Sequence, residues 1–246
     1  MKGKIFIVSH KEFTPPKSEI YTPIAVGMTD FNSYYRDDCG DNISHLNSSF
    51  CELTAMYWVW KNFEEKDDYI VGLCHYRRYF KGREGIISQG EIENGMAEYD
   101  IITAKKRSYY FISVRNHYRK AHNYQDILLL RDEIKVQHPE YIESFEKVMN
   151  SNKLSLYNML ITKKNIFDEY CEWLFPLLFS IKDKINTEEY DVYQRRVIGF
   201  LSERMFNVWL EFNKKNYKIK EVAVFNTDGE NRFKKGINLL KRQYLK

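Results

Sequence analysis

Short apolar runs alternate with amphipathic segments along this chain. The runs at 4–9, 69–73 and 100–104 are rich in β-branched residues and predict buried strands, and a fourth strand is predicted at 154–162. Between about residues 10 and 42 three prolines and two glycines stand among polar residues, which predicts a long irregular connection. Strands that alternate with helices are typical of an α/β domain with a mostly parallel sheet.

The clearest helix is predicted from Asn42 or Ser44, either of which can cap it, to about residue 63. Its apolar stripe recurs every three or four residues and comprises Leu46, Phe50, Leu53, Tyr57 and Trp60. Glu52 and Asn47 lie off this stripe, so solvated side chains are predicted there. Further helices are predicted at 116–150, 165–179 and about 192–212.

Length and composition indicate one sizeable domain. With 246 residues, 43% of them hydrophobic, the chain suits a single α/β domain over 1–230. The net charge of +4 does not favour a nucleic-acid partner. The four cysteines are scattered and no apolar run is long enough for a membrane span, which predicts a soluble cytoplasmic protein.

The C-terminal segment 231–246 differs from the rest in charge. It has basic and apolar residues at helical spacing and no acidic residue, which predicts a basic amphipathic helix. Such a helix could lie on the anionic inner face of the plasma membrane, or dock on the core with a solvated basic face.

The most informative stretch is 72–80, where His75, Tyr76, Arg77 and Arg78 follow an apolar run. Ligands of open α/β sheets bind at the carboxyl edge of the strands, and arginine pairs with phosphate oxygens in a bidentate way. The cluster therefore suits a diphosphate, although a solvated basic edge would also explain it. His10 ends the first predicted strand in the same way.

Three carboxylates and an arginine crowd the turn 36–42. Asp37, Asp38 and Asp41 could hold a divalent cation or hydrogen-bond a ribose or base, and Asp41 with Asn42 could cap the helix that follows. Two further histidines, His117 and His122, flank a basic aromatic patch and are candidates for the acceptor side of a site. No phosphate-binding P-loop, nucleophile elbow, dinucleotide-binding glycine pattern or paired zinc motif is present, so a nucleotide-sugar site suits the sequence best.

Five ordered blocks of sequence, spread over about residues 4 to 212, carry a family resemblance: 36–44, 51–62, 72–80, 157–159 and 195–204. They resemble a bacterial capsular and exopolysaccharide synthesis family, long catalogued as a domain of unknown function, with galactofuranosyltransferase-like members. The order also resembles a GT-A glycosyltransferase. The resemblance implies a GT-A-like, Rossmann-related α/β fold with a helical insertion on the acceptor side.

The resemblance also implies roles for single residues. Donor contacts are implied for His10, Arg36, Asp37, Asp38, Asp41, Asn42, His75, Tyr76, Arg77, Arg78, Arg195 and Arg196. Acceptor contacts are implied for Asn158 and His122, and the catalytic base is sought among Asp191, Glu203 and His117. GT-A enzymes usually carry an Asp-x-Asp metal motif where 75–78 stands, so either these cations replace the metal or Mn²⁺ or Mg²⁺ assists them.

The function implied is transfer of a sugar, with galactofuranose and galactose as the candidates, from a uridine diphosphate donor to a lipid-linked oligosaccharide. The main alternative is a carbohydrate or sugar-phosphate binding module without catalysis. A nucleic-acid binder that uses the basic aromatic stretches is the weaker third interpretation.

Overall fold

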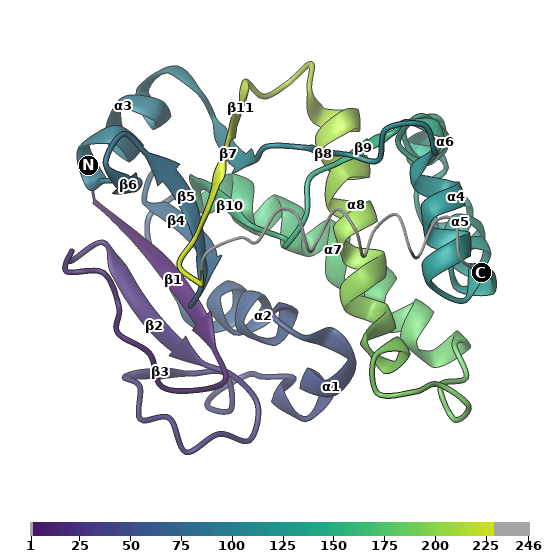
Figure 1. Cartoon of the computed structure of the whole chain (residues 1–246), viewed down its shortest axis with the longest axis horizontal. Coiled ribbons are helices and arrows are strands. Elements are labelled where there is room, and N and C mark those ends of the chain that lie inside the picture. Colours follow the sequence, from purple (N-terminus) through teal and green to yellow (C-terminus); the bar gives the residue numbers. More distant parts are fainter. Residues whose placement is uncertain (1, 229–246) are drawn as a thin grey trace.

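A computed structural model describes residues 2–228, and the predicted C-terminal helix at 231–246 lies outside these residues. A central sheet fills one side of the molecule and three helices, α4 to α6, the other, with α8 between them (Figure 1). This arrangement confirms the prediction of an α/β fold with a mostly parallel sheet flanked by helices.

The main path of the sheet has the order β11-β7-β10-β4-β1-β2-β3. Its strands are β1 (Gly3–Ser9), β2 (Tyr21–Ala25), β3 (Tyr35–Arg36), β4 (Ile70–His75), β7 (Ile101–Ala104), β10 (Leu160–Lys163) and β11 (Ile219–Val222). All neighbours are parallel except β10, which runs antiparallel to β4 and β7. Short strands extend one corner, namely β5 (Arg78–Gly82), β6 (Gly85–Ile86) and β12 (Val224–Asn226), and β8 (Arg107–Ser108) pairs apart from them with β9 (Lys153–Leu154).

Eight α-helices and three short 3₁₀ helices are described. They are η1 (Ser44–Leu46), α1 (Asn47–Phe50), α2 (Leu53–Asn62), α3 (Gln89–Glu98), α4 (Val114–Ala121), α5 (Tyr124–Gln137), η2 (Pro139–Tyr141), α6 (Ile142–Asn150), α7 (Lys164–Lys184), η3 (Gln194–Arg196) and α8 (Val197–Asn213). Side chains define several starts, because Ser113 and Asn123 accept backbone N–H groups at the heads of α4 and α5.

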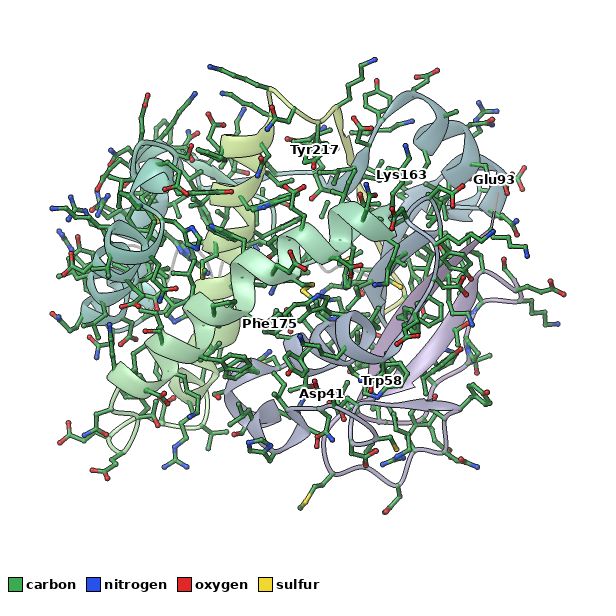
Figure 2. All side chains as sticks on the ribbon, turned by 180° about the vertical axis from the view of Figure 1, so that it is seen from behind. Asp41, Trp58, Glu93, Lys163, Phe175 and Tyr217 are labelled. Carbon is green, nitrogen blue, oxygen red and sulfur yellow. The ribbon has the colours of Figure 1, made fainter. Side chains whose placement is uncertain are left out.

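The sheet is covered on both faces. Alternate residues of β1 divide between the two cores: Phe6 and Val8 pack with α2, α7 and α8, whereas Ile5 and Ile7 pack with α3 and β5. Side chains of a strand point to opposite faces in turn, so a strand buried on both faces is apolar throughout. The long helix α7 crosses the first face and carries Phe175 (Figure 2). The Phe175 ring stacks on that of Trp60 in α2, with 5.5 Å between the ring centroids.

Several predicted boundaries were wrong. The irregular connection contains β2, which the sequence hid because Pro23 is unusual in a strand; it is tolerated because β3 reaches only the last two residues of β2. The strand predicted at 154–162 is two strands, β9 and β10, joined by a turn. His75 is the last residue of β4 rather than part of a loop, and Arg78 begins β5.

The predicted helix at 42–63 is broken at Cys51. This residue adopts a left-handed φ of 54°, and Asn47 fastens the break by donating from Nδ2 to the Cys51 carbonyl and to Thr54 Oγ1, both at 2.9 Å. As a consequence Glu52 stands at the head of α2 instead of on the solvated face of one long helix.

Candidate functional site

The topology brings three segments to one edge of the sheet. β1 and β4 are parallel, with Val8 opposite His75, so both strands end at this carboxyl edge. β10 runs the other way, and Leu160 pairs with Leu73, so the turn that precedes β10 lies at the same edge. The head of α2 and one face of α8 complete the surroundings, which makes this edge the candidate site.

His75 holds the turn before β10. Its Nε2 lies 2.8 Å from the carbonyl oxygen of Tyr157, and a carbonyl only accepts, so the imidazole donates from Nε2. Burial lowers the pKa of His75 to about 4, and the charges of Arg78 and Arg77 contribute to this. His75 is therefore neutral at physiological pH and acts here as a fixed hydrogen-bond donor.

The turn itself has an unusual backbone. Tyr157 and Asn158 both have positive φ, 78° and 50°, which costs free energy in residues with a side chain. The Tyr157 N–H donates to Glu203 Oε1 at 2.8 Å, and Asn158 Nδ2 donates to Glu52 Oε1 at 2.9 Å and to Ser202 Oγ at 2.8 Å. Hydrogen bonds from β4, α2 and α8 thus hold a strained turn in place.

Glu52 and Glu203, called the carboxylate pair below, face this turn from two helices. Burial raises the pKa of both side chains, and the negative charge of Glu52 adds to the rise at Glu203. Arg204 opposes the rise at Glu203, since its guanidinium lies 3.2 Å from Oε2. A raised pKa makes a carboxylate a stronger base, which suits a general base.

Arg77, Arg78 and Arg196 are called the arginine cluster below. The positive charges of Arg196 and Arg78 oppose the rise in the pKa of Glu52, and those of Arg78 and Arg77 help to lower the pKa of His75. The Arg78 guanidinium lies over the Tyr157 ring at 4.6 Å, and Arg196 Nε lies 3.2 Å from Cys51 Sγ. The pKa of His10 is lowered by burial and then by the positive charges of Lys11, Arg77 and Arg196. Positive charge therefore gathers where β1 and β4 end.

Tyr76 lies between the two strand ends. The ring of His10 meets the ring of Tyr76 edge-on at 5.4 Å, and the Tyr76 N–H donates to the Val8 carbonyl. Arg77 lies near the described end of the chain, 3.5 Å from Asp228. Both predicted donor contacts at 76–77 thus belong to one surface with His10.

The acidic turn at 36–42 uses its side chains internally. Asp37 is almost fully buried and accepts the Gly27 N–H at 3.1 Å, while Asp38 pairs with Arg36 at 2.9 Å. Asp41 accepts from the Tyr57 hydroxyl at 3.1 Å, and Asn42 donates to the Gly40 carbonyl at 2.9 Å. These contacts shape the connection beside the carboxyl edge, and their predicted donor role stays a prediction.

The remaining predicted residues lie on the α4 and η3 side. His117 stacks on Tyr109 at 4.1 Å, and His122 Nδ1 lies 3.1 Å from Gln194 Oε1. Asp191 accepts the Gln194 N–H at 2.7 Å, and Arg195 Nε donates to the Tyr190 carbonyl at 3.0 Å. The structure therefore brings Glu203, Asn158, His75, Arg78 and Arg196 together. It places Asp191 just before η3 and Arg195 within it.

Three residues of the site were not predicted: Glu52, Ser202 and Arg204. All three lie inside sequence blocks that carry the family resemblance, and this position was the only signal available. Periodicity placed Glu52 on a solvated face because the break at Cys51 has no glycine or proline to mark it.

The side chains at this edge do not fit a divalent cation. Mn²⁺ and Mg²⁺ prefer carboxylate oxygens, whereas the strand ends present arginines, and the carboxylate pair already accepts hydrogen bonds from Asn158 Nδ2 and the Tyr157 N–H. Within residues 2–228 there is no group of three or more His, Cys, Asp or Glu side chains that could hold a metal ion. In the same residues no helix is both long and apolar enough to cross a membrane.

Comparison with known proteins agrees with this architecture. A solved structure described as the apo form of the WbbM bifunctional glycosyltransferase superposes with a TM-score of 0.84 at 28% identity. The match covers 94% of this chain and 46% of that one, so the chain spans about half the length of that protein. No curated protein matches the sequence.

The GT-A-like fold expected from the sequence is thereby confirmed. A family model described as "Domain of unknown function (DUF4422)" matches residues 4–215, which is most of the chain. The sequence blocks that suggested such a family lie within this range. The chain belongs to the DUF4422 family.

Proposed function

We propose that this protein is a glycosyltransferase that moves a sugar from a uridine diphosphate donor to a glycan acceptor. The observation that carries the proposal is the meeting of the arginine cluster and the carboxylate pair at the carboxyl edge of the sheet. The reaction needs cations that neutralise the anionic diphosphate and a group that accepts the proton of the acceptor hydroxyl. The likeness to a bifunctional glycosyltransferase supports the same conclusion.

In this proposal Arg77, Arg78 and Arg196 neutralise the donor diphosphate, which leaves with the electron pair of the broken glycosidic bond. The nucleoside lies on the side of His10 and the 36–42 turn. Arginine holds its charge at every physiological pH, so no metal ion is required for this neutralisation. We expect turnover to continue in the presence of EDTA.

We assign the base role to Glu203 rather than to Asp191 or His117. Glu203 takes the proton from the acceptor hydroxyl while the oxygen of that hydroxyl attacks the anomeric carbon of the donor. Its raised pKa supports this role. Asp191 is exposed at the head of η3, and the ring of His117 is stacked on Tyr109.

The proposed sugar, acceptor and biosynthetic setting are those that the family resemblance implies. Galactofuranose or galactose is the proposed sugar, a lipid-linked oligosaccharide is the proposed acceptor, and capsular, exopolysaccharide or O-antigen synthesis is the proposed setting. The basic segment 231–246 would attach a cytoplasmic enzyme to the anionic inner face of the membrane, where such acceptors reside. Binding to vesicles with and without anionic lipid tests the attachment, with a chain ending at residue 230 as the control.

Release of uridine diphosphate from UDP-galactose and UDP-galactofuranose, with a lipid-diphosphate acceptor, tests the function. We expect Arg78→Ala to abolish donor binding and Glu203→Gln to lower kcat at least a hundredfold while donor affinity is retained. Arg83→Ala, in the β5–β6 turn, is the matched control. Binding without turnover in the wild type would favour a sugar-phosphate binding module instead, and absence of both would exclude the proposal.

A further inference from the structure

Three aromatic rings beyond the arginine cluster form what is called here the aromatic wall: His122, Tyr193 and Phe200. His122 lies 4.2 Å from Phe200 and 5.9 Å from Tyr193 between ring centroids, the latter pair nearly parallel at 16°. Tyr193 and Phe200 lie 5.0 Å apart. Tyr193 is 45% exposed, and the other two rings are half-buried. Three rings in mutual contact thus reach the surface together.

The wall is continuous with the reaction centre. The Arg196 guanidinium lies 5.9 Å from the centre of the Phe200 ring, and the same Arg196 contacts Cys51 next to Glu52. Glu203 follows Phe200 by three residues in α8, so the two side chains neighbour each other on one helix face. A molecule that rests on the wall therefore lies beside the proposed base, on the α4 side rather than the β1 side.

The segment that carries Tyr193 is held firmly. Gln194 Nε2 donates to the Ala121 carbonyl at 2.9 Å, while Gln194 Oε1 faces His122 Nδ1. Nearer the start of the segment, the Tyr190 hydroxyl donates to Asp126 at 2.7 Å. An exposed ring that is fixed in this way loses little conformational entropy when a ligand binds, which suits a preformed binding surface.

We propose that the aromatic wall is the acceptor subsite and binds the apolar face of a sugar ring in the acceptor glycan. One face of a sugar ring carries C–H groups with slight positive charge, and the face of an aromatic ring carries negative charge, so the two stack. The hydroxyl groups of the sugar then point toward Glu203 and the arginine cluster. This inference rests on the proposed function, and it names the acceptor side of that site.

A nucleobase could also stack on aromatic rings, but the wall is built on α8 and the end of α4, whereas the nucleoside is proposed at His10 and the 36–42 turn, which follow β1 and β3. The two occupants predict different results. If the wall binds sugar, its variants lose affinity for glycosides and keep affinity for uridine diphosphate.

The test uses methyl glycosides of galactopyranose, galactofuranose, glucose and mannose as probes, titrated in saturation-transfer NMR with the full chain and saturating uridine diphosphate. We expect the wild type to bind at least one glycoside. Tyr193→Ala and Phe200→Leu should weaken that binding about three- to ten-fold, while Tyr193→Phe keeps it. Tyr99→Ala, beside the amino end of β7, is the control and should change nothing.

Unchanged glycoside affinity in both Tyr193→Ala and Phe200→Leu would overturn the inference, as would the absence of glycoside binding in the wild type. A parallel loss of affinity for uridine diphosphate would assign the wall to the nucleoside and also overturn it. The protein could also bind glycosides through the wall and neither bind nor turn over UDP-sugars. That result would support the sugar subsite and contradict the proposed transferase function.

Discussion

Burial shifts the pKa values of the titratable side chains around the strained turn. His75 is kept neutral, with a pKa of about 4, while the pKa values of Glu52 and Glu203 are raised. The two effects make opposite contributions to stability as the pH changes. Single substitutions that remove one titration at a time should separate them.

The lowered pKa of His75 predicts a loss of stability in acid. Below pH 6.5 the unfolded chain binds a proton at His75, whereas the folded protein binds it only below about pH 4. The free energy of unfolding therefore decreases as the pH falls through this interval. The loss amounts to about 2–3 kcal/mol. His75→Gln can still donate to the Tyr157 carbonyl, and urea unfolding from pH 8 to 4 should show a smaller decline for this variant. Parallel curves for the two proteins would contradict the prediction.

The raised pKa of Glu52 makes stability change with pH in the opposite direction. Its stabilising contribution is present below the pKa of the unfolded chain and is lost as pH rises through the higher pKa of the folded protein. Glu52→Gln keeps an oxygen that can accept from Asn158, so we expect it to stabilise the fold by about 1 kcal/mol at pH 8 and by little at pH 4.5. Thermal melting at both pH values is the measurement. A variant that is less stable than the wild type at pH 8 would show that the charge contributes to stability.

The sequence pointed to three arginines and to Glu203 of the candidate site, but not to Glu52 or to the hydrogen-bond partners of these side chains. Arg78 is visible because it follows a predicted strand, whereas Arg196 and Glu203 are visible because they stand in a sequence block that carries the family resemblance. Glu52 was assigned to solvent because its role depends on the left-handed conformation of Cys51, which no local residue preference favours. Such a conformation is imposed by the surroundings, here by Asn47 and Thr54.

At the scale of elements, Gly72 of β4 allows the neighbouring strands β1 and β10 to approach β4 closely. A Cβ added at Gly72 would lie 2.6 Å from the Ile5 side chain of β1, 2.9 Å from the Ile161 side chain of β10 and 3.0 Å from the Leu160 carbonyl oxygen. The space between these strands has room for a hydrogen atom only.

Gly72→Ala should therefore destabilise the protein by about 2 kcal/mol, since β1 and β10 must move apart. Gly90 in α3 is the matched control, because a Cβ there meets nothing within 4 Å. Gly90→Ala should stabilise the helix by about 0.5 kcal/mol. Chemical denaturation of both variants checks the pair, and equal effects at the two positions would contradict the packing argument.

Elements with a strong apolar pattern were predicted best. The predicted positions of the strands β1, β4 and β7 agree with the structure to within two residues, and those of the amphipathic helices α7 and α8 to within five. β2, β9 and the turn before β10 were missed because long-range pairing defines them, whereas their local sequences favour other conformations. The order of strands in the sheet has no local signal at all.

At the scale of the whole molecule, the candidate site joins two halves. Arg78 begins β5 and Arg77 lies in the turn before it, on the sheet side, while Arg196 ends η3 and Glu203 lies in α8, which packs with the helical side (Figure 1). A diphosphate that contacts all three arginines would connect the halves.

Binding of uridine diphosphate should therefore slow amide hydrogen exchange in two separate places, at 76–78 and at 194–204. A ligand at a hundred times its Kd stabilises the folded protein by about 2.7 kcal/mol, and exchange that requires opening of the site slows accordingly. The amides of α3, at the other edge of the sheet, should not change. Protection confined to one of the two segments would mean that the ligand does not bridge them.

The antiparallel strand β10 has a consequence for the growing polypeptide. It fills the gap between β4 and β7, yet it follows β7 by more than fifty residues in the chain. During translation β4 and β7 are made early, each with an unpaired edge that can recruit a foreign strand. A fragment that stops at residue 150 should aggregate, and one that reaches residue 228 should not, as light scattering of the two would show. The edges of β4 and β7 that face each other are thus exposed to misassociation until β10 leaves the ribosome and pairs with both, and the other edge of β7 stays open until β11 follows.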